Sequence, residues 1–225
     1  MNKIKWVIFA AFVIGILGFL VVFSNNSKIN VDKIDVNMTQ AADKQNGNIA
    51  DHVYGNPDSK VTLIAYGDYQ CPPCGQAYPL IKSVTEEYKD KIKYIFRNFP
   101  LTTIHANAKA AAASAEAAGL QGKYWEMHNK IYENQSDWST LSDTQRSDFF
   151  ANYAKDLELD VDKFNSDITT SAITDKINYD LALGKKAGVE GTPTIILDGT
   201  KLDSSIWGDS TKFKEAIDKE LVKNK

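Results

Sequence analysis

The first pattern along the chain is an uninterrupted apolar run from Trp6 to Phe23, which is followed by a polar stretch. As a helix, the apolar run would be roughly 27 Å long, close to the thickness of a bilayer core. Residues 1–23 are therefore predicted to form an N-terminal transmembrane helix that anchors the chain, or else a signal sequence that is removed. Residues 24–50 show no apolar period and are predicted to form a polar linker.

After this linker, strand-like and helix-like segments alternate. Apolar runs at 60–66 and 92–99 predict two strands, and a short entry strand is predicted at 51–57. The segment between the two longer strands has helical spacing from Cys71 onward, and Pro79 is expected to kink that helix.

The middle of the chain, from 103 to about 184, shows helical periodicity throughout. The predicted helices lie at 107–118, at 124–132, after the capping box Ser142-x-x-Gln145, at 161–168 behind Asp160, and at 172–186. A strand at 194–197, a turn at Asp198-Gly199 and an amphipathic helix at 211–222 complete the pattern. This order predicts an α/β fold, in which a sheet domain at 51–103 and 185–225 carries an inserted all-helical domain at 104–184.

The composition is that of an ordinary globular protein, with 43% hydrophobic and 24% charged residues. The formal net charge of -3 and a pI near 5.7 argue against a nucleic-acid partner. The sequence holds no glycine-rich phosphate loop and no serine in a nucleophile elbow. Trp125, Trp138 and Trp207 are interpreted as core or groove-wall residues. The candidate chemistry therefore rests on the cysteines.

Both cysteines of the chain, Cys71 and Cys74, stand where a predicted strand gives way to a helix. A helix start offers unpaired N–H groups and the positive end of the helix dipole, and both favour a thiolate. Cys71, just before the helix, is the candidate nucleophile with an accessible sulfur. Cys74, one turn into the helix, is expected to be more buried and to act as the resolving thiol. Thiol–disulfide exchange requires this asymmetry.

Three other roles for the pair are weaker. A structural zinc site needs about four ligands, yet the chain has no second cysteine pair and His52, His105 and His128 are scattered, so no metal site is predicted. A structural disulfide across so short a loop would stabilise little, because the stabilisation grows with loop length. An inert reduced pair does not suit an exported domain.

Pro72 and Pro73 separate the two cysteines and are the candidate residues that tune the site. Proline fits the first helical turn, where its missing N–H would be unpaired in any case. Two prolines nevertheless remove two donors that could have bonded the Cys71 thiolate. The sequence therefore predicts a Cys71 pKa that is lowered, but less than where a histidine stands between the cysteines.

A second signal lies far along the chain, at Gly191-Thr192-Pro193-Thr194, which opens the strand at 194–197. A proline at such a place is typical of a strand edge or a cis turn. Together with a strand–Cys-X-X-Cys–helix segment it becomes informative, because the two segments are expected to meet in space.

On these residues, the chain resembles the DsbA-like thiol–disulfide oxidoreductases of the thioredoxin superfamily. The resemblance covers most of residues 50–223 and rests on the segments 61–74, 97–101, 115–119, 122–128 and 191–194. It implies a thioredoxin-like fold with an inserted helical domain. It also implies that Pro193 is a cis-proline facing Cys71, and that the backbone of Thr192 pairs with an extended substrate as an added strand.

The chain departs from this family's pattern at Ala65, where many members carry a buried acid six residues before the first cysteine. A buried carboxylate helps to move the proton of the inner thiol, so reduction by Cys74 is expected to be less efficient without it. The Pro72-Pro73 pair also occurs in reducing thioredoxin-like proteins, which leaves the direction of electron flow open.

The predicted function is that of an extracytoplasmic thiol–disulfide oxidoreductase, held at the cell membrane by a single span or secreted if the signal is cleaved. It exchanges the Cys71–Cys74 disulfide with exported proteins, as a dithiol oxidase that needs no bound cofactor. The resemblance implies cysteine-containing, unfolded exported proteins as substrates, and a quinone-linked membrane partner of the DsbB or VKOR type that reoxidises the pair. Two alternatives remain: a disulfide reductase or isomerase fed by a membrane electron donor, and a non-catalytic, membrane-anchored binding module on the same fold.

Overall fold

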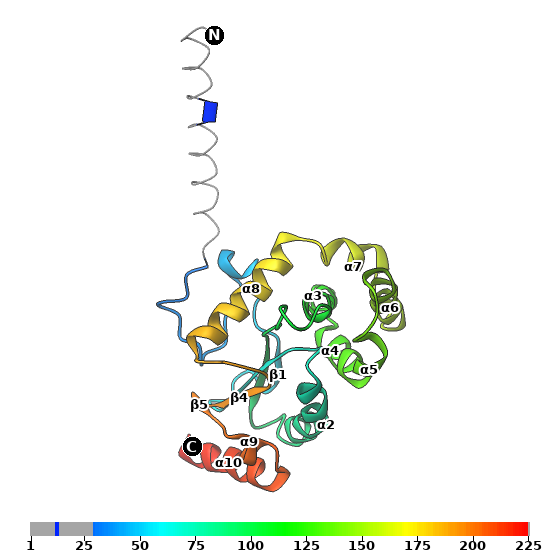
Figure 1. The fold of residues 1–225 in the computed structure, drawn as a ribbon. Helices are drawn as coiled ribbons and strands as arrows, with labels where there is room; N and C mark the ends of the chain where they lie inside the picture. The colour runs from blue at the N-terminus through cyan, green and yellow to red at the C-terminus, as the bar shows by residue number, and fades with distance from the viewer. Residues whose placement is uncertain (1–11, 14–28, 225) are drawn as a thin grey trace, which may run out of the picture. The chain divides into compact units, whose positions relative to one another are not determined.

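A five-stranded sheet organises the fold, with strand order β1-β3-β2-β4-β5 (Figure 1). The structure is a computed structural model and describes residues 12, 13 and 29–224. β2 (Thr62–Gly67) and β3 (Lys93–Asn98) run parallel to each other. The other three strands pair antiparallel to their neighbours: β1 (Val53–Gly55), β4 (Thr194–Leu197) and β5 (Thr200–Lys201).

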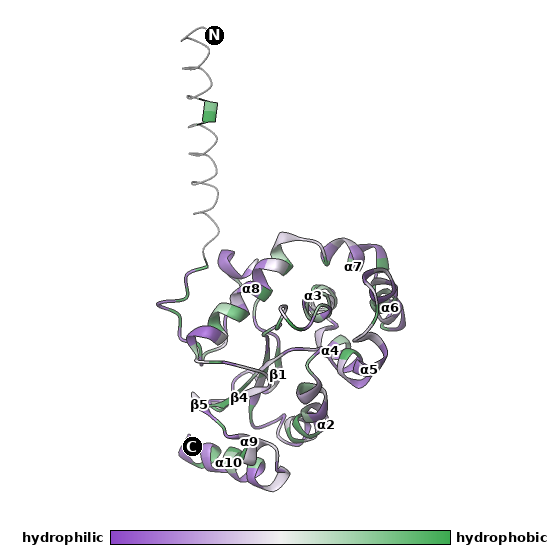
Figure 2. Ribbon diagram, viewed as in Figure 1, coloured by the Kyte–Doolittle hydropathy of each residue, from purple (hydrophilic) through white to green (hydrophobic). Residues whose placement is uncertain are grey.

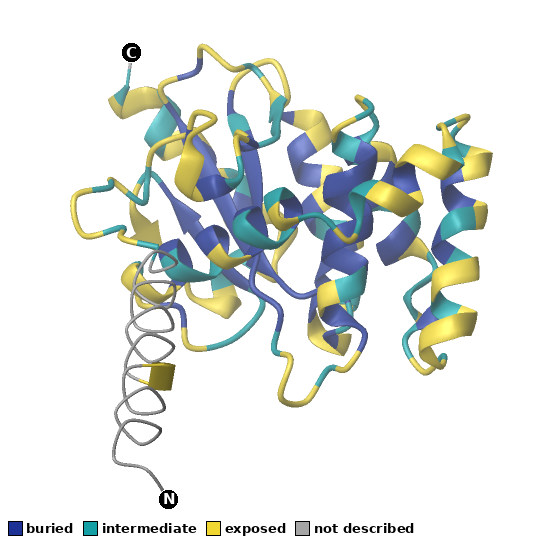
Figure 3. Ribbon diagram, turned by 90° about the horizontal axis from the view of Figure 1, so that it is seen from above, coloured by how far each residue is buried: buried dark blue, intermediate teal, exposed yellow. Residues whose placement is uncertain are grey.

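Helices cover both faces of this sheet. Every residue of β2 and β4 is buried, as Figure 3 shows in dark blue, and such continuous burial is typical of strands covered on two sides. Side chains alternate along β2, so Leu63 and Ala65 share a core with Cys74 of α2 (Pro72–Glu87). Tyr66 points the other way, where a Cβ on Gly184 would lie 3.0 Å from its ring. α2 therefore lies on one face and α8 (Ser171–Lys186) on the other.

Two connections follow from this arrangement. α2 joins β2 to β3, because a parallel strand pair needs a crossover that is usually helical. Its internal proline, Pro79, is accommodated within one continuous helix. The last helix, α10 (Ser210–Lys223), buries Phe213 and Ile217 and carries both hydrophilic and hydrophobic residues along its length in Figure 2, as predicted for an amphipathic helix.

The middle of the chain is helical, as its periodicity predicts. Its elements are α3 (Ala108–Gly119), α4 (Tyr124–Glu133), α5 (Gln135–Trp138), α6 (Asp143–Asp156), α7 (Val161–Asp167) and α8. The capping box of Ser142 and Gln145 begins α6, and the Asp160 carboxylate accepts a hydrogen bond from the Lys163 N–H at the start of α7, so both predicted helix starts are confirmed. The short helices α5 and α9 (Ser204–Trp207) had no sequence signal. The domain boundaries at 104 and 184 stay a prediction.

Two of the three tryptophans interpreted as core or groove-wall residues, Trp125 and Trp138, belong to these helices. Trp138 is fully buried, and its indole N–H donates to the Ile131 carbonyl at 2.8 Å. Trp125 is partly buried and packs against the main core. Their surroundings are hydrophobic and aromatic, as expected of packing residues rather than ligand contacts.

The segment at 31–50 does not form the free linker that its polar sequence predicts. Its short 3-10 helix η1 (Lys44–Asn46) packs on α8, and Gln40, Asn46 and Ile49 are buried. The Lys186 ammonium donates to three carbonyl oxygens of this segment at 2.7 Å each, those of Val31, Asp32 and Ile34. Polar side chains here form hydrogen bonds with backbone groups instead of facing water. The amino-acid composition of the segment cannot predict such hydrogen bonds.

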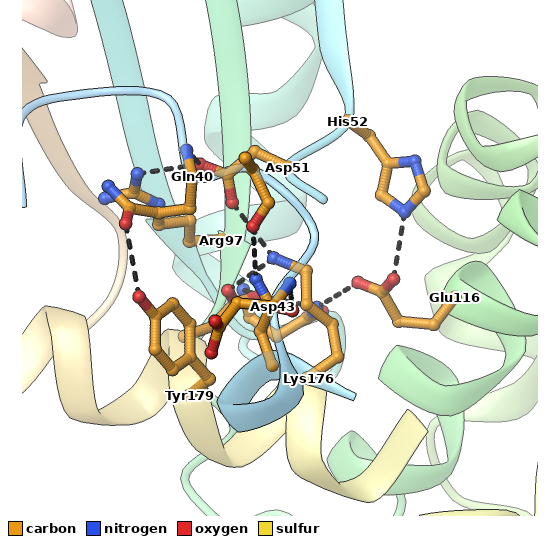
Figure 4. A network of polar contacts seen from close by, with 12 residues as sticks. Gln40, Asp43, Asp51, His52, Arg97, Glu116, Lys176 and Tyr179 are labelled. Atoms are coloured by element: carbon orange, nitrogen blue, oxygen red, sulfur yellow. Dashed lines mark hydrogen bonds and ion pairs between the residues drawn. The ribbon is translucent and has the colours of Figure 1, made fainter. Parts of the chain in front are cut away.

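A buried ionic network joins this segment to the sheet and to α8 (Figure 4). Asp51 accepts from the Arg97 guanidinium at 2.8 Å and from the Lys176 ammonium at 2.9 Å. Lys176 also contacts Asp180 at 2.7 Å, and all four side chains are at most 1% exposed. Arg97 reaches further to the Val36 and Met38 carbonyls, at 2.5 and 2.7 Å.

The predicted membrane anchor at 1–23 lies outside the described residues, apart from Phe12 and Val13, which are both exposed. Within the described part of the chain, no helix is long and apolar enough to span a bilayer.

Candidate active site

The two cysteines lie at the start of α2, as predicted. Cys71 is the N-cap of the helix, in an extended backbone conformation, and Pro72 and Pro73 occupy the first turn and are exposed. Cys74 follows one turn later, and its N–H donates to the Cys71 carbonyl at 3.0 Å. Both cysteines are free thiols.

The predicted difference in exposure between the two sulfurs is smaller than expected. Cys71 is 5% exposed and Cys74 is 3% exposed, so Cys71 is not the openly accessible residue that its position suggests. Fewer atoms surround Cys71 than Cys74, which leaves Cys71 nearer the surface.

The two thiols differ strongly in acidity. A hydrogen bond from the Cys74 thiol is the largest cause that lowers the pKa of Cys71 to about 6, against the opposing effect of burial. Donating that hydrogen bond, together with burial, raises the pKa of Cys74 well above its usual range. At neutral pH the pair therefore holds one proton, on Cys74, and one negative charge, on Cys71.

The distant segment at 191–194 meets Cys71, as the sequence predicts. The Thr192–Pro193 peptide bond is cis, and the Cys71 sulfur lies 3.4 Å from the Thr192 carbonyl oxygen. The Thr192 hydroxyl is buried without a hydrogen-bond partner, next to the same sulfur. Cys71, Cys74, Thr192 and Pro193 thus form one site, while their individual roles in turnover stay predictions.

A groove of about 490 Å³ runs beside Thr192 and Pro193. Its walls come from the 191–194 segment, from residues 201–204 and from Trp207 of α9. Trp207 is half-buried here, which agrees with its interpretation as a groove-wall residue. Thr192 lines this groove and its carbonyl oxygen contacts the Cys71 sulfur, so the groove is the place where an extended substrate could lie.

Several residues that hold the active-site loop in place carried no sequence signal. The Gln135 amide donates to the carbonyls of Tyr69 and Cys71, at 2.7 and 2.9 Å, although it comes from the inserted helices. Gly75 permits this approach, because a Cβ there would collide with the Gln135 amide. A hydrogen bond from a side-chain amide to a backbone carbonyl 64 residues away gives no periodic pattern in the sequence.

Asp68 and His105 form a second support for the same loop. Asp68 is 1% exposed and accepts from the Gln70 N–H at 2.7 Å, the Leu101 N–H at 2.8 Å and His105 Nδ1 at 2.7 Å. The Cys71 N–H in turn donates to the Asp68 carbonyl at 3.1 Å. This carboxylate fixes the turn before Cys71, a structural role that the sequence did not suggest.

The position where an acid is missing, Ala65, lies beside Cys74 and is buried. His128 is buried, and its Nδ1 lies 2.8 Å from the Tyr69 hydroxyl. Among residues 12, 13 and 29–224, no three His, Cys, Asp or Glu side chains lie close enough together to hold a metal ion.

Known proteins resemble this chain in sequence and in fold. A family model described as thioredoxin matches residues 47–219. The thiol–disulfide exchange protein α-DsbA2 of Wolbachia pipientis is 27% identical, with a TM-score of 0.64 over 78% of this chain and 90% of that chain. Oxidised BdbD of Bacillus subtilis has a similar fold, with a TM-score of 0.66 and 22% identity over 82% of this chain and 97% of that one.

One curated relative is of another kind. The Na(+)/H(+) antiporter NhaA 1 of Salinispora arenicola is 36% identical over 151 residues, which are 67% of this chain and 22% of the antiporter. This chain therefore spans only about a fifth of the length of that relative.

Proposed function

The chain belongs to the thioredoxin family, and from this premise we propose that it is an extracytoplasmic dithiol oxidase of exported proteins. In general terms, the chain is a DsbA-like thiol–disulfide oxidoreductase, in agreement with the resemblance found in the sequence. Its reactive groups are the Cys71 and Cys74 sulfurs.

The observation that carries the proposal is the lowered pKa of Cys71, at about 6. A low pKa makes Cys71 a good leaving group, because the departing sulfur is stable as a thiolate at neutral pH. It also stabilises the reduced form of the pair relative to the disulfide, which makes the disulfide a stronger oxidant. Both effects favour transfer of the disulfide to a substrate over reduction of one.

The exchange proceeds in two displacements. A substrate thiolate attacks the Cys71 sulfur, the Cys71–Cys74 bond breaks, and Cys74 leaves and takes up a proton. The second substrate thiolate then attacks the substrate sulfur of the mixed disulfide and releases Cys71 as a thiolate. Two electrons pass from the substrate dithiol to the pair, and the groove beside Thr192 and Pro193 holds the substrate as an added strand.

The same proposal includes a location and a partner. The apolar run at 6–23 supports a membrane-anchored protein with its redox domain outside the cytoplasm, where disulfides persist. Reoxidation of the reduced pair then needs an electron acceptor, for which we propose a quinone-linked membrane protein. Labelling intact cells with a membrane-impermeant thiol reagent, after reduction of the Cys71–Cys74 pair, tests the location, since only an extracytoplasmic Cys71 reacts.

The direction of electron flow is tested by equilibrating the pair in glutathione redox buffers. An oxidase is expected to have a potential towards about −120 mV, whereas a value near about −270 mV would indicate a reductase. The matching activity assays are oxidation of a reduced, unfolded protein and reduction of insulin disulfides.

A Cys71→Ser variant separates both enzymes from a binding module. An oxidase or reductase loses turnover with this change, because Cys74 alone cannot form the Cys71–Cys74 disulfide through which the two electrons pass. Retention of the cellular function by Cys71→Ser would contradict the proposal and favour a protein that uses the groove without redox chemistry.

A further inference from the structure

The helix that carries the cysteines begins without an ordinary cap. An N-cap side chain usually accepts a hydrogen bond from an N–H of the first turn. The Cys71 side chain makes no such bond, and Pro72 and Pro73 have no N–H to donate. The first N–H groups of the helix that reach the Cys71 carbonyl are those of Cys74 and Gly75, at 3.0 and 3.1 Å. The start of this helix therefore depends on support from elsewhere in the fold.

Gln135 supplies this support from outside the helix. It is the first residue of α5, among the helices between β3 and β4, and its amide nitrogen donates to the Tyr69 and Cys71 carbonyls at 2.7 and 2.9 Å. A side-chain amide nitrogen has two N–H groups, so both are used on the active-site loop. The two bonds fix the direction of the Cys71 carbonyl and of the carbonyl two residues before it.

The helix turn that carries Gln135 is held firmly in place. Trp138, at the end of α5, is fully buried and donates its indole N–H to the Ile131 carbonyl at 2.8 Å. From the active-site loop, the Gln70 amide donates to the Ser139 carbonyl, directly after α5, at 2.7 Å. The loop and α5 are thus bonded at both ends of this short helix, which gives Gln135 a fixed position.

Gly75 gives the Gln135 amide the space that it occupies. Gly75 follows Cys74 in α2, where alanine would favour the helix more than glycine does. A Cβ at this position would lie 2.8 Å from the Gln135 amide carbon and closer still to the amide oxygen, too close for both atoms. A residue that weakens its own helix to permit a contact beside a reactive group is typical of a functional site.

We propose that Gln135 is a positioning residue of the exchange reaction, which holds the Cys71 backbone so that the Cys71 sulfur stays in contact with the Cys74 thiol. The inference rests on the proposed function, because it concerns the thiolate that leaves in that reaction. The Cys74 thiol is the main hydrogen-bond donor to this thiolate. The Cα of Cys71 carries both the held carbonyl group and the side chain, so a turn of the backbone moves the sulfur away from its donor. Gln135 acts through the backbone, because both of its donated bonds go to carbonyls.

The test is the pH dependence of Cys71 alkylation by iodoacetamide in the reduced, full-length protein. A wild-type midpoint at the ordinary thiol value of about 8.5 would mean that the proposed function itself fails. With a wild-type midpoint near about 6, the role of Gln135 is judged from its variants. The other titratable groups that act on Cys71 are Cys74 and Asp68, and every variant keeps both.

Gln135→Leu keeps an unbranched start to the side chain and removes both donors. It should raise the midpoint by about one pH unit, because weakening a hydrogen bond to a charged group costs about that much. The reduced pair loses stability with it, so the equilibrium with glutathione at pH 7 should shift about five-fold towards the Cys71–Cys74 disulfide. Equal midpoints for Gln135→Leu and wild-type protein would overturn the proposal.

Gln121→Leu is the matched control for this variant. The Gln121 amide also bridges to the backbone of another segment, because it donates to the Asp160 carbonyl at 3.1 Å and accepts from the Asp160 N–H at 3.0 Å. Its loss should leave the alkylation midpoint and the glutathione equilibrium unchanged. A shift as large as that of Gln135→Leu would show that the loss of any such bridge disturbs Cys71, against the proposal.

Gly75→Ala displaces the same amide while the Gln135 side chain is kept. The amide is the far end of a flexible side chain and can move aside, and alanine strengthens α2. This variant should therefore raise the midpoint as Gln135→Leu does, although its melting temperature does not fall. In a Gln135→Ala background, where the amide is gone, Gly75→Ala should cause no further rise. An unchanged midpoint in Gly75→Ala, or an added rise in the double variant, would equally refute the role of Gln135.

Discussion

The reactivity of Cys71 depends more on one neighbouring sulfur than on the helix that it begins. The sequence suggested a thiolate stabilised by helix N–H groups and the dipole, weakened by Pro72 and Pro73. The pKa of Cys71 is lowered, as predicted, but the largest cause is the hydrogen bond from the Cys74 thiol. The prolines that remove backbone donors thus leave the sulfur–sulfur contact as the main source of acidity.

This cause can be tested by removing the donor. Cys74→Ala should raise the pKa of Cys71 from about 6 towards its ordinary value, because the thiolate loses its hydrogen bond. Cys74→Ser keeps a donor at the same place and should change the pKa much less. The measurement is the pH dependence of the alkylation rate, and an unchanged midpoint in Cys74→Ala would disprove this account.

The Thr192 hydroxyl offers a second, weaker contribution. It is buried without a hydrogen-bond partner, and it can turn to donate to Cys71 once that sulfur is ionised. Thr192→Val, which removes only this donor, should raise the pKa of Cys71 by less than Cys74→Ala does. Thr194→Val is the control, since the Thr194 hydroxyl already donates to the Gly191 carbonyl at 2.8 Å. Equal alkylation profiles for wild-type protein and Thr192→Val would exclude the contact.

The lowered pKa also makes the stability of the reduced protein depend on pH. Because the pKa of Cys71 is lower in the folded state, its contribution is fully present above the ordinary thiol pKa of about 8.5. It is lost as the pH falls through about 6. Urea unfolding of the reduced protein should therefore show an advantage over Cys71→Ser that is largest near pH 9 and absent at pH 5. A pH-independent difference between the two proteins would contradict the lowered pKa.

At the scale of the elements, local patterns predicted more than they missed. The apolar run at 60–66 became a fully buried strand, and the capping residues Ser142 and Asp160 begin helices as expected. The contact between Cys71 and Thr192 was also expected, because a Cys-X-X-Cys pair and a Thr-Pro pair are local signals, while the roles of these residues stay predictions. These elements depend on short-range spacing, which a sequence displays directly.

The parts that the sequence did not predict depend on contacts between distant segments. Gln135 holds the Cys71 carbonyl across 64 residues, and Asp68 is bound by His105 from another loop. The segment at 31–50 packs against α8 through polar groups, so its composition suggested a free linker. Side chain–backbone contacts of this kind have no period, and only the folded structure reveals them.

The ionic network between β3, α8 and Asp51 predicts a large stability difference between two aspartates. Asp51→Asn leaves the buried charges of Arg97 and Lys176 short of a partner and should cost about 3–5 kcal/mol in the free energy of unfolding. Asp156→Asn, in the exposed pair with Lys130, should cost at most about 1 kcal/mol. Urea unfolding of both variants measures these free energies. Equal losses in the two variants would show that the network does not stabilise the fold.

At the scale of the whole molecule, this network joins segments that are far apart in the sequence. The Asn98 amide donates to Glu116 and Asp180 and so adds Glu116 to the network. Among the described residues its buried carboxylates are then Asp51, Glu116 and Asp180, and its permanent cations are Arg97 and Lys176. Burial raises the pKa of Asp180 to about 6, and the charges of Asp51 and Glu116 act in the same direction despite the contact with Lys176. Asp180 is therefore the carboxylate of the network that takes up a proton as the pH falls towards about 6.

The same network makes the segment at 31–50 part of the folded unit, which truncations can test. Removal of residues 1–30 leaves every described contact of Arg97 in place and should not change the melting temperature or the alkylation rate of Cys71. Removal of residues 1–50 deprives Arg97 of the Val36 and Met38 carbonyls, and Asp51 of the Gln40 N–H.

Hydrogen bonds to charged groups contribute about 1.5–3 kcal/mol each, so the longer truncation should lose several kcal/mol of stability. It should also expose the face of α8 that η1 covers. Thermal unfolding of the two truncated proteins gives the comparison. Equal melting temperatures would mean that residues 31–50 contact the domain without stabilising it, as expected of a linker.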